Sequence, residues 1–249
     1  MLDFWTRTSG TWINIATVLL GTTVGLLLGQ RLPEGMRQVV TQSVGLLTLW
    51  LGFSMAGSLR QASAGPIDGV ILGLLALILG GLLGEGWQLE RRLNQLGDWL
   101  QQRFRGHGRF TEGFVATSLL FCIGPMTVVG SLNNGLTGDN QLLVLKAVMD
   151  GLVSIPFASS YGVGVGFSVL TIALVQGGLS LLAGVLAGAI ADPATDPRVL
   201  LSTGVGGLLI LGIGLSLLDL AHLRLASFLP AILLAPLLYA IATHLVAGG

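Results

Sequence analysis

The sequence predicts an all-α membrane protein that crosses the bilayer about eight times. Of its 249 residues, 52% are hydrophobic and 10% are charged, whereas charged residues make up about a quarter of ordinary soluble domains. The apolar residues are grouped into stretches of the length that a membrane-spanning helix needs. The formal net charge is zero and no basic patch is present, so no nucleic-acid partner is expected. The lipid bilayer is the expected surrounding.

Eight candidate spans follow one another along the chain. They lie near residues 11–29, 39–58, 67–84, 113–132, 141–160, 163–191, 199–218 and 227–247. The first is interpreted as a retained helix, because no small-residue cleavage pattern in polar surroundings follows it. The fifth is the least hydrophobic, because it contains Lys146, Asp150 and Pro156. A re-entrant or broken helix at this place, and seven spans in all, is the alternative.

One hydrophilic stretch, residues 85–112, separates the third span from the fourth. Its leucines recur at helical spacing while arginine and glutamine occupy the other faces, which indicates an amphipathic helix. Trp87 and Trp99 suit a membrane interface. Five arginines predict that this linker is cytoplasmic in a plasma (inner) membrane protein. Alternation then places the loops at 131–140 and 191–197, and both termini, outside.

Two parts of the chain resemble each other. Residues 43–55 (SVGLLTLWLGFSM) match residues 205–217 (VGGLLILGIGLSL), and Gly21 and Gly25 match Gly184 and Gly188 after a one-residue gap. Equivalent spans lie five apart and therefore run in opposite directions, which predicts an inverted 3+3 repeat. Residues 11–84 would form the first copy, 163–249 the second and 113–162 an inserted central helix pair. A chance match between apolar segments is the alternative.

Ionisable groups inside a predicted span mark the candidate site. Lys146, the only lysine of the chain, and Asp150 lie one turn apart on one helix face, and Ser154 lies a turn further on. Such groups at membrane depth are costly and usually functional. Gly124-Pro125 interrupts the preceding span, and interruptions of this kind expose backbone groups that line cavities. The predicted substrate- or ion-binding residues are Lys146, Asp150, Ser154, Asn133, Asn134, Gly124 and Pro125.

These features favour a membrane transporter of a small solute or ion, with a polar midplane site around Lys146 and Asp150. In one alternative the ion pair only neutralises itself and holds helices together. In another the protein is a non-transporting scaffold, assembly or regulatory protein. Its glycine-rich helix faces, such as Gly21-x-x-x-Gly25, would also allow a homo-oligomer.

Motifs for other chemistries are missing from the sequence. No enzyme is expected, because there is no H-E-x-x-H pair and no G-x-S-x-G in a suitable context. No metal site is expected, because the three histidines lie in separate segments. Gly162-x-Gly164-x-Gly166 lacks the strand–turn–helix context of a dinucleotide fingerprint, so no cofactor is expected.

Four motifs together resemble the YqgA-like bacterial membrane proteins, known as domain of unknown function 554. They are FCIGPMTVVGSLNNGLTGD, KAVMDG, LLSTGVGGLLILGIGLSLL and FLPAILLAP. The resemblance extends over essentially the whole chain, from GTWINIATVLLGTTVGLLLG to the last helix. It implies a multi-spanning plasma-membrane protein without a defined activity, of a family sometimes labelled as transporters. It carries no function onto residues 85–112.

Overall fold

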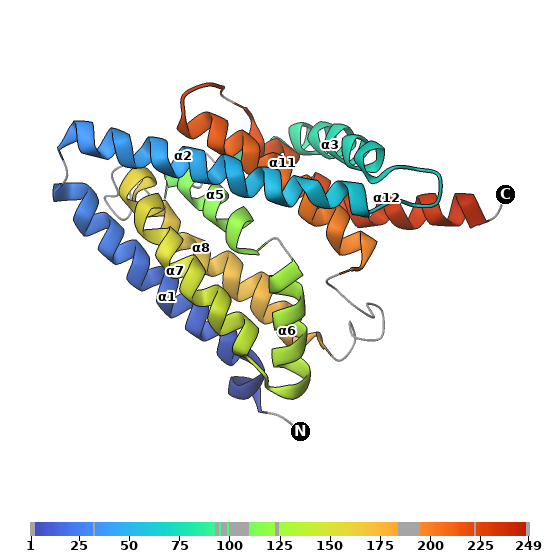
Figure 1. Ribbon diagram of the computed structural model, residues 1–249, viewed down its shortest axis with the longest axis horizontal. Coiled ribbons are helices and arrows are strands. Elements are labelled where there is room, and N and C mark those ends of the chain that lie inside the picture. Colours follow the sequence, from blue (N-terminus) through green and yellow to red (C-terminus); the bar gives the residue numbers. More distant parts are fainter. Residues whose placement is uncertain are drawn as a thin grey trace. The chain divides into compact units, whose positions relative to one another are not determined.

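The computed structural model describes residues 3–31, 33–92, 95, 99, 110–122, 125–183, 195–221 and 223–247. Within those ranges the chain is helical with short connections and has no β-strand, apart from one isolated bridge between Ala64 and Ile67. The predicted all-α fold is confirmed (Figure 1). The chain divides into two compact units. Unit 1 is Met1–Val44 with Gly97–Pro193, and unit 2 is Gly45–Leu96 with Ala194–Gly249.

Unit 1 contains the N-terminal helix, the start of the second helix and the helices of the central part of the chain. In chain order they are α1 (Phe4–Arg31), the start of α2 (Glu34–Ala56), α5 (Phe110–Cys122), α6 (Pro125–Thr137), α7 (Gln141–Tyr161), α8 (Gly164–Ile172), the π-turn η2 (Ala173–Gly177) and α9 (Gly178–Leu181). Helix α7 is capped at its C-terminus by Gly162, whose φ of 84° favours glycine.

Glycine allows α1 and α7 to pack backbone to backbone. Gly10 lies against Leu143 and Gly25 against Ile155, so the two helices run parallel. A side chain at Gly25 would collide with the backbone carbonyl of Ile155. Small residues permit this close approach where lipid supplies no hydrophobic driving force between helices. The predicted glycine faces therefore contact helices within the chain, whereas the homo-oligomer stays a prediction.

The segment formed by α8, η2 and α9 packs against α1 in the opposite direction. Gly166 lies against Thr22 of α1, and Gly177, eleven residues further on, lies against Thr11. The contacts move back along α1 as they move forward along this segment. The two elements are therefore antiparallel.

Unit 2 contains two helical hairpins. They are formed by the rest of α2, the 3₁₀ turn η1 (Gly57–Gln61) and α3 (Gly69–Gly86), and by α11 (Pro197–Leu217), the 3₁₀ turn η3 (Leu225–Phe228) and α12 (Leu229–Ala247). Helices α3 and α11 begin with aspartate caps: Asp68 accepts from the Val70 N–H, and Asp196 from the Arg198 N–H. Gly45 of α2 lies against Leu218 at the end of α11 and Gly52 lies against Leu211, so these helices are antiparallel.

The number of spans agrees with the sequence. Among the described residues, seven helices are long and apolar enough to cross a membrane, or eight if α5 and α6 form one broken span. The first helix begins at Phe4 rather than near residue 11, because Asp3 caps it through the Thr6 N–H. The predicted doubtful span, the fifth, is the continuous helix α7.

A change of helix direction lies in the fourth predicted span, where Gly124-Pro125 was predicted to interrupt the helix. Helices α5 and α6 differ in direction by 62°. The second of them begins at Pro125, a position where a helix does not need the N–H that proline lacks. Gly124, which was predicted to contribute to the break, lies outside the described residues.

The hydrophilic linker is described at residues 85–92, 95 and 99. Glu85 accepts a hydrogen bond of 2.7 Å from Arg224, and Glu90 accepts one of 2.9 Å from the Ala226 N–H. These contacts join the end of α3 to the connection between α11 and α12. The remainder of the predicted amphipathic helix, like the end of the sixth predicted span, lies outside the described residues.

Candidate functional site

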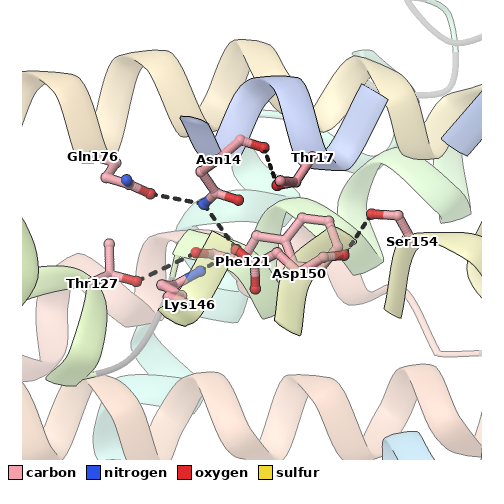
Figure 2. Close-up of polar contacts among 8 residues, drawn as sticks. All are labelled: Asn14, Thr17, Phe121, Thr127, Lys146, Asp150, Ser154 and Gln176. Carbon is pink, nitrogen blue, oxygen red and sulfur yellow. Dashed lines mark hydrogen bonds and ion pairs between the residues drawn. The ribbon is translucent and has the colours of Figure 1, made fainter. Parts of the chain in front are cut away.

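The site is built on the middle of α7, where two ionisable side chains form an ion pair. Lys146 and Asp150 are four residues apart, and the Lys146 ammonium donates to Asp150 Oδ2 (Figure 2). Both residues are 7% exposed. The helix therefore brings the two groups together as the spacing predicts, and burial withholds water from them. A charge pair removed from water needs further hydrogen bonds to offset its lost hydration.

Asn14 of α1 supplies one such hydrogen bond from a neighbouring helix. Its Nδ2 donates to Asp150 Oδ2 over 2.9 Å and to Gln176 Oε1 over 3.0 Å. Asn14 and Gln176 are both fully buried. Gln176 belongs to η2, and π-turns within helices occur frequently at functional sites. Figure 2 shows the resulting chain of polar side chains from Gln176 through Asn14 to the ion pair.

Sequence reasoning missed Asn14 and Gln176. Each is a carboxamide within an otherwise apolar predicted span, and each such group needs a buried partner. They are also 162 residues apart, which is the spacing of the matched segments that begin at residues 43 and 205. These two signals together would have identified the pair.

The other side of the ion pair is formed by α5 and α6. The Phe121 ring centroid lies 5.9 Å from Lys146 Nζ, within reach of a cation–π interaction. Thr127 Oγ1 donates to the Phe121 carbonyl over 3.3 Å. This bond connects the two helices across their change of direction.

The remaining predicted site residues lie elsewhere or are already engaged. The Ser154 hydroxyl donates to the Asp150 carbonyl over 2.7 Å, a bond within α7. Asn134 is fully buried and binds the start of α1, donating to the Thr6 carbonyl and accepting from the Gly10 N–H. Asn133 is exposed. No hydrogen bond among the described residues joins Asn133 or Asn134 to Asp150.

Several buried polar atoms near the α1–η2 contact have no hydrogen-bond partner in the described part of the chain. They are Asn14 Oδ1, Gln176 Nε2, Thr11 Oγ1 and Ser180 Oγ. Leaving a buried polar group unpaired costs about 1–3 kcal/mol. The site therefore contains buried hydrogen-bond donors and acceptors that form no hydrogen bond within the described part of the chain. The described residues contain no group of three side chains suited to a metal ion.

A groove of about 400 Å³ lies between α1 and the segment α8–α9. Its lining is largely apolar, and it includes Thr11 and Gly177. Thr11 is one turn from Asn14 on α1, and Gly177 follows Gln176. The groove thus runs beside the amide pair.

Comparison with known proteins identifies relatives over almost the full length. Residues 9–240 match the family model described as "Protein of unknown function (DUF554)". The chain is 35% identical over 233 residues to "Uncharacterized protein YqgA" of Escherichia coli (strain K12), covering 91% of this chain and 94% of that protein. It is 30% identical over 227 residues to "Uncharacterized membrane protein YdfK" of Bacillus subtilis (strain 168), covering 91% and 93%. No solved structure matches the chain significantly.

Proposed function

Because the chain belongs to the DUF554 family of membrane proteins, we propose that it is a transporter of a small solute or ion across the plasma (inner) membrane. Asp150 is the ligand or coupling carboxylate, and Lys146 is its counter-ion. The observation that carries this proposal is the buried chain Gln176–Asn14–Asp150–Lys146, which joins three helical elements in the middle of apolar spans. Ionisable groups in such a position mark ion and substrate pathways in membrane proteins.

The contacts within unit 2 support the inverted repeat that this proposal uses. If 162 is added to the residue from the first hairpin and subtracted from the residue of the second, three observed contacts between the hairpins become three other observed contacts. Three contacts recur in this way: Gly45–Leu218 with Gly207–Ala56, Gly52–Leu211 with Gly214–Leu49, and Gly84–Ser227 with Gly65–Val246. If residue i contacts residue j, and the counterpart of j also contacts the counterpart of i, the interface has two-fold symmetry.

The direction of the helices determines the direction of this two-fold axis. Gly45 meets Leu218 and Gly52 meets Leu211, so α2 and its counterpart α11 are antiparallel. An axis that exchanges two antiparallel neighbours is perpendicular to both helices. For helices that cross a bilayer, that axis lies in the membrane plane, as in the inverted repeats of secondary transporters.

The purely structural alternative makes a different prediction about energy. A buried ion pair is often replaceable by apolar residues of similar volume without loss of stability, whereas removal of one partner costs about 3–5 kcal/mol. The described site also contains the unpaired atoms Asn14 Oδ1 and Gln176 Nε2, which a structural ion pair does not need. These atoms favour a binding role over a structural one.

The test measures ligand binding and flux with the paired variant Lys146→Met with Asp150→Leu. Purified protein is screened by thermal unfolding against Na⁺, K⁺, Mg²⁺, amino acids and dicarboxylic acids, since a ligand of the folded state raises its melting temperature. Proton and solute flux is then measured in liposomes. We expect the paired variant to fold and to lose binding and flux, while Asp139→Asn, a matched charge removal in an exposed loop, retains both. A folded paired variant with undiminished flux would move the assignment to the scaffold or regulatory alternative.

We further propose that the linker at 85–112 faces the cytoplasm and that both termini face outside. The arginine bias places this linker and the loop containing Arg224 on the same side. The hydrogen bond between Glu85 and Arg224 supports that assignment, because it joins the two segments within unit 2.

A further inference from the structure

We propose that Gln176 is an alternate partner of the Asp150 carboxylate, which exchanges with Asn14 when the protein changes state. This inference rests on the proposed transporter and its inverted repeat. In the present structure Asn14 holds the carboxylate through a hydrogen bond of 2.9 Å, while Gln176 binds Asn14. In the other state Gln176 donates to Asp150, and Asn14 is released from it.

Asn14 and Gln176 occupy positions that the repeat spacing relates to each other. They are 162 residues apart, the spacing that relates the hairpins of unit 2. The helices that carry them are antiparallel, because Gly166 lies against Thr22 and Gly177 against Thr11. The two-fold operation exchanges the two helices of such an antiparallel pair. A contact between a residue and its own counterpart is therefore mapped onto itself. The two amides therefore meet at the centre of the contact between α1 and the segment formed by α8, η2 and α9.

The two amides form unequal numbers of hydrogen bonds. Asn14 Nδ2 donates to both Asp150 and Gln176, whereas Gln176 Nε2 is buried without a partner among the described residues. Exchange of the two environments would give Gln176 the bonds that Asn14 makes now. An amide whose donor group lacks a partner at such a position is expected if the protein has two states and the structure shows one of them.

The backbone conformation also differs between the two amides. Asn14 lies in regular α-helix, whereas Gln176 lies in the π-turn η2. A π-turn accommodates one additional residue. The repeats thus differ in backbone conformation at the amide pair itself.

The exchange requires only a short movement of the side chains. Gln176 Oε1 is 3.0 Å from Asn14 Nδ2, which is 2.9 Å from Asp150 Oδ2. One amide group separates Gln176 from the carboxylate. Because an inverted repeat interchanges the two sides of the membrane, the two partners of Asp150 belong to states that open to opposite sides.

The experiment reads the state from the accessibility of two reporter cysteines. Ser9→Cys and Thr171→Cys are introduced separately after replacement of Cys122 by alanine. Each reporter lies five residues before an amide, Asn14 or Gln176, and the antiparallel helices place the reporters on opposite sides of the pair. Purified protein is labelled with a water-soluble thiol reagent.

We expect Asn14→Leu to change the labelling rates at the two reporters in opposite directions, by roughly tenfold, because it removes a bond made in one state only. Gln176→Met should leave both rates unchanged or shift them in the reverse directions. Gln141→Met, at the start of α7, is the matched control and should have no effect. If Asn14→Leu does not fold, Asn14→Ser replaces it with the same expected directions.

Changes of the same sign at both reporters, or no change with Asn14→Leu, would overturn the exchange. Labelling needs no substrate, so its outcome is separable from that of transport. Loss of flux in Asn14→Leu without a labelling shift would reject the exchange and leave the transporter standing. Opposite labelling shifts in a protein without flux of any probe would retain the exchange and reject the transporter.

Discussion

Gly151 lies beside Asp150 on α7 and determines how closely α1 approaches the carboxylate. A Cβ added at Gly151 would lie 2.9 Å from Thr17 Cβ and 3.0 Å from the Thr17 carbonyl oxygen. Carbon atoms in favourable contact are about 3.5–4.0 Å apart. Gly151→Ala therefore pushes α1 away by roughly 0.6 Å or more at this point. Thr17 is one turn from Asn14, so the bond of 2.9 Å between Asn14 and Asp150 lengthens to about 3.5 Å, beyond good hydrogen-bond geometry.

The free energy of unfolding should fall for two reasons. The higher helix propensity of alanine offsets only part of this loss. Overpacking costs about 1–3 kcal/mol, and loss of a hydrogen bond to a charged group costs about 1.5–3 kcal/mol. The gain in helix propensity on replacing glycine by alanine is about 1 kcal/mol. We expect a net loss of about 1.5–5 kcal/mol, or roughly 3–20 °C in melting temperature for a chain of this size.

The assay is thermal unfolding of the purified protein in detergent, with ligand binding measured on the same samples. Gly178→Ala is the matched control, because no atom lies within 4 Å of the added Cβ and the residue is in the same unit. The control should be neutral or more stable than the parent by up to about 1 kcal/mol. A Gly151→Ala protein as stable as the Gly178→Ala protein would refute the packing argument.

Three further predictions concern topology, the N-terminal arginine and a helix cap. On a cysteine-free background, Asp139→Cys should react with an impermeant thiol reagent outside intact cells and Arg92→Cys should not; the reverse pattern would invert the proposed orientation. Arg7→Met should lower the melting temperature by the equivalent of about 1–3 kcal/mol, because Arg7 donates to carbonyls of α6 and α9 over 3.1 and 2.8 Å; an unchanged melting temperature would contradict this. Partial burial acts to raise the pKa of Asp196, but hydrogen bonds from Arg198 outweigh it and the pKa lies below its usual range. The folded state therefore gains stability from Asp196 above the unfolded pKa and loses it as pH falls through the folded value. Asp196→Asn keeps the cap, so its stability deficit should shrink as the pH of the unfolding assay is lowered from about 6 to 3, and a deficit independent of pH would contradict the shift.

The sequence by itself determined the membrane class, the number of spans and the pairing of Lys146 with Asp150. Long apolar stretches have only one environment in which they are stable, and backbone hydrogen bonding in that environment requires helices. Residues four apart meet on any helix, whatever surrounds it. These features depend on local composition and spacing, so no tertiary contact is needed to derive them.

Tertiary structure decided which groups surround the ion pair. Asn14 reaches Asp150 because glycines let α1 lie directly on α7. Gln176 reaches Asn14 because η2 packs against α1. Asn134, which the sequence placed in the site, is drawn instead to the start of α1, where it finds both donors and acceptors. The rotation of each helix about its axis determines these outcomes. It is set by packing between segments up to 162 residues apart, and a pattern read along one helix does not contain it.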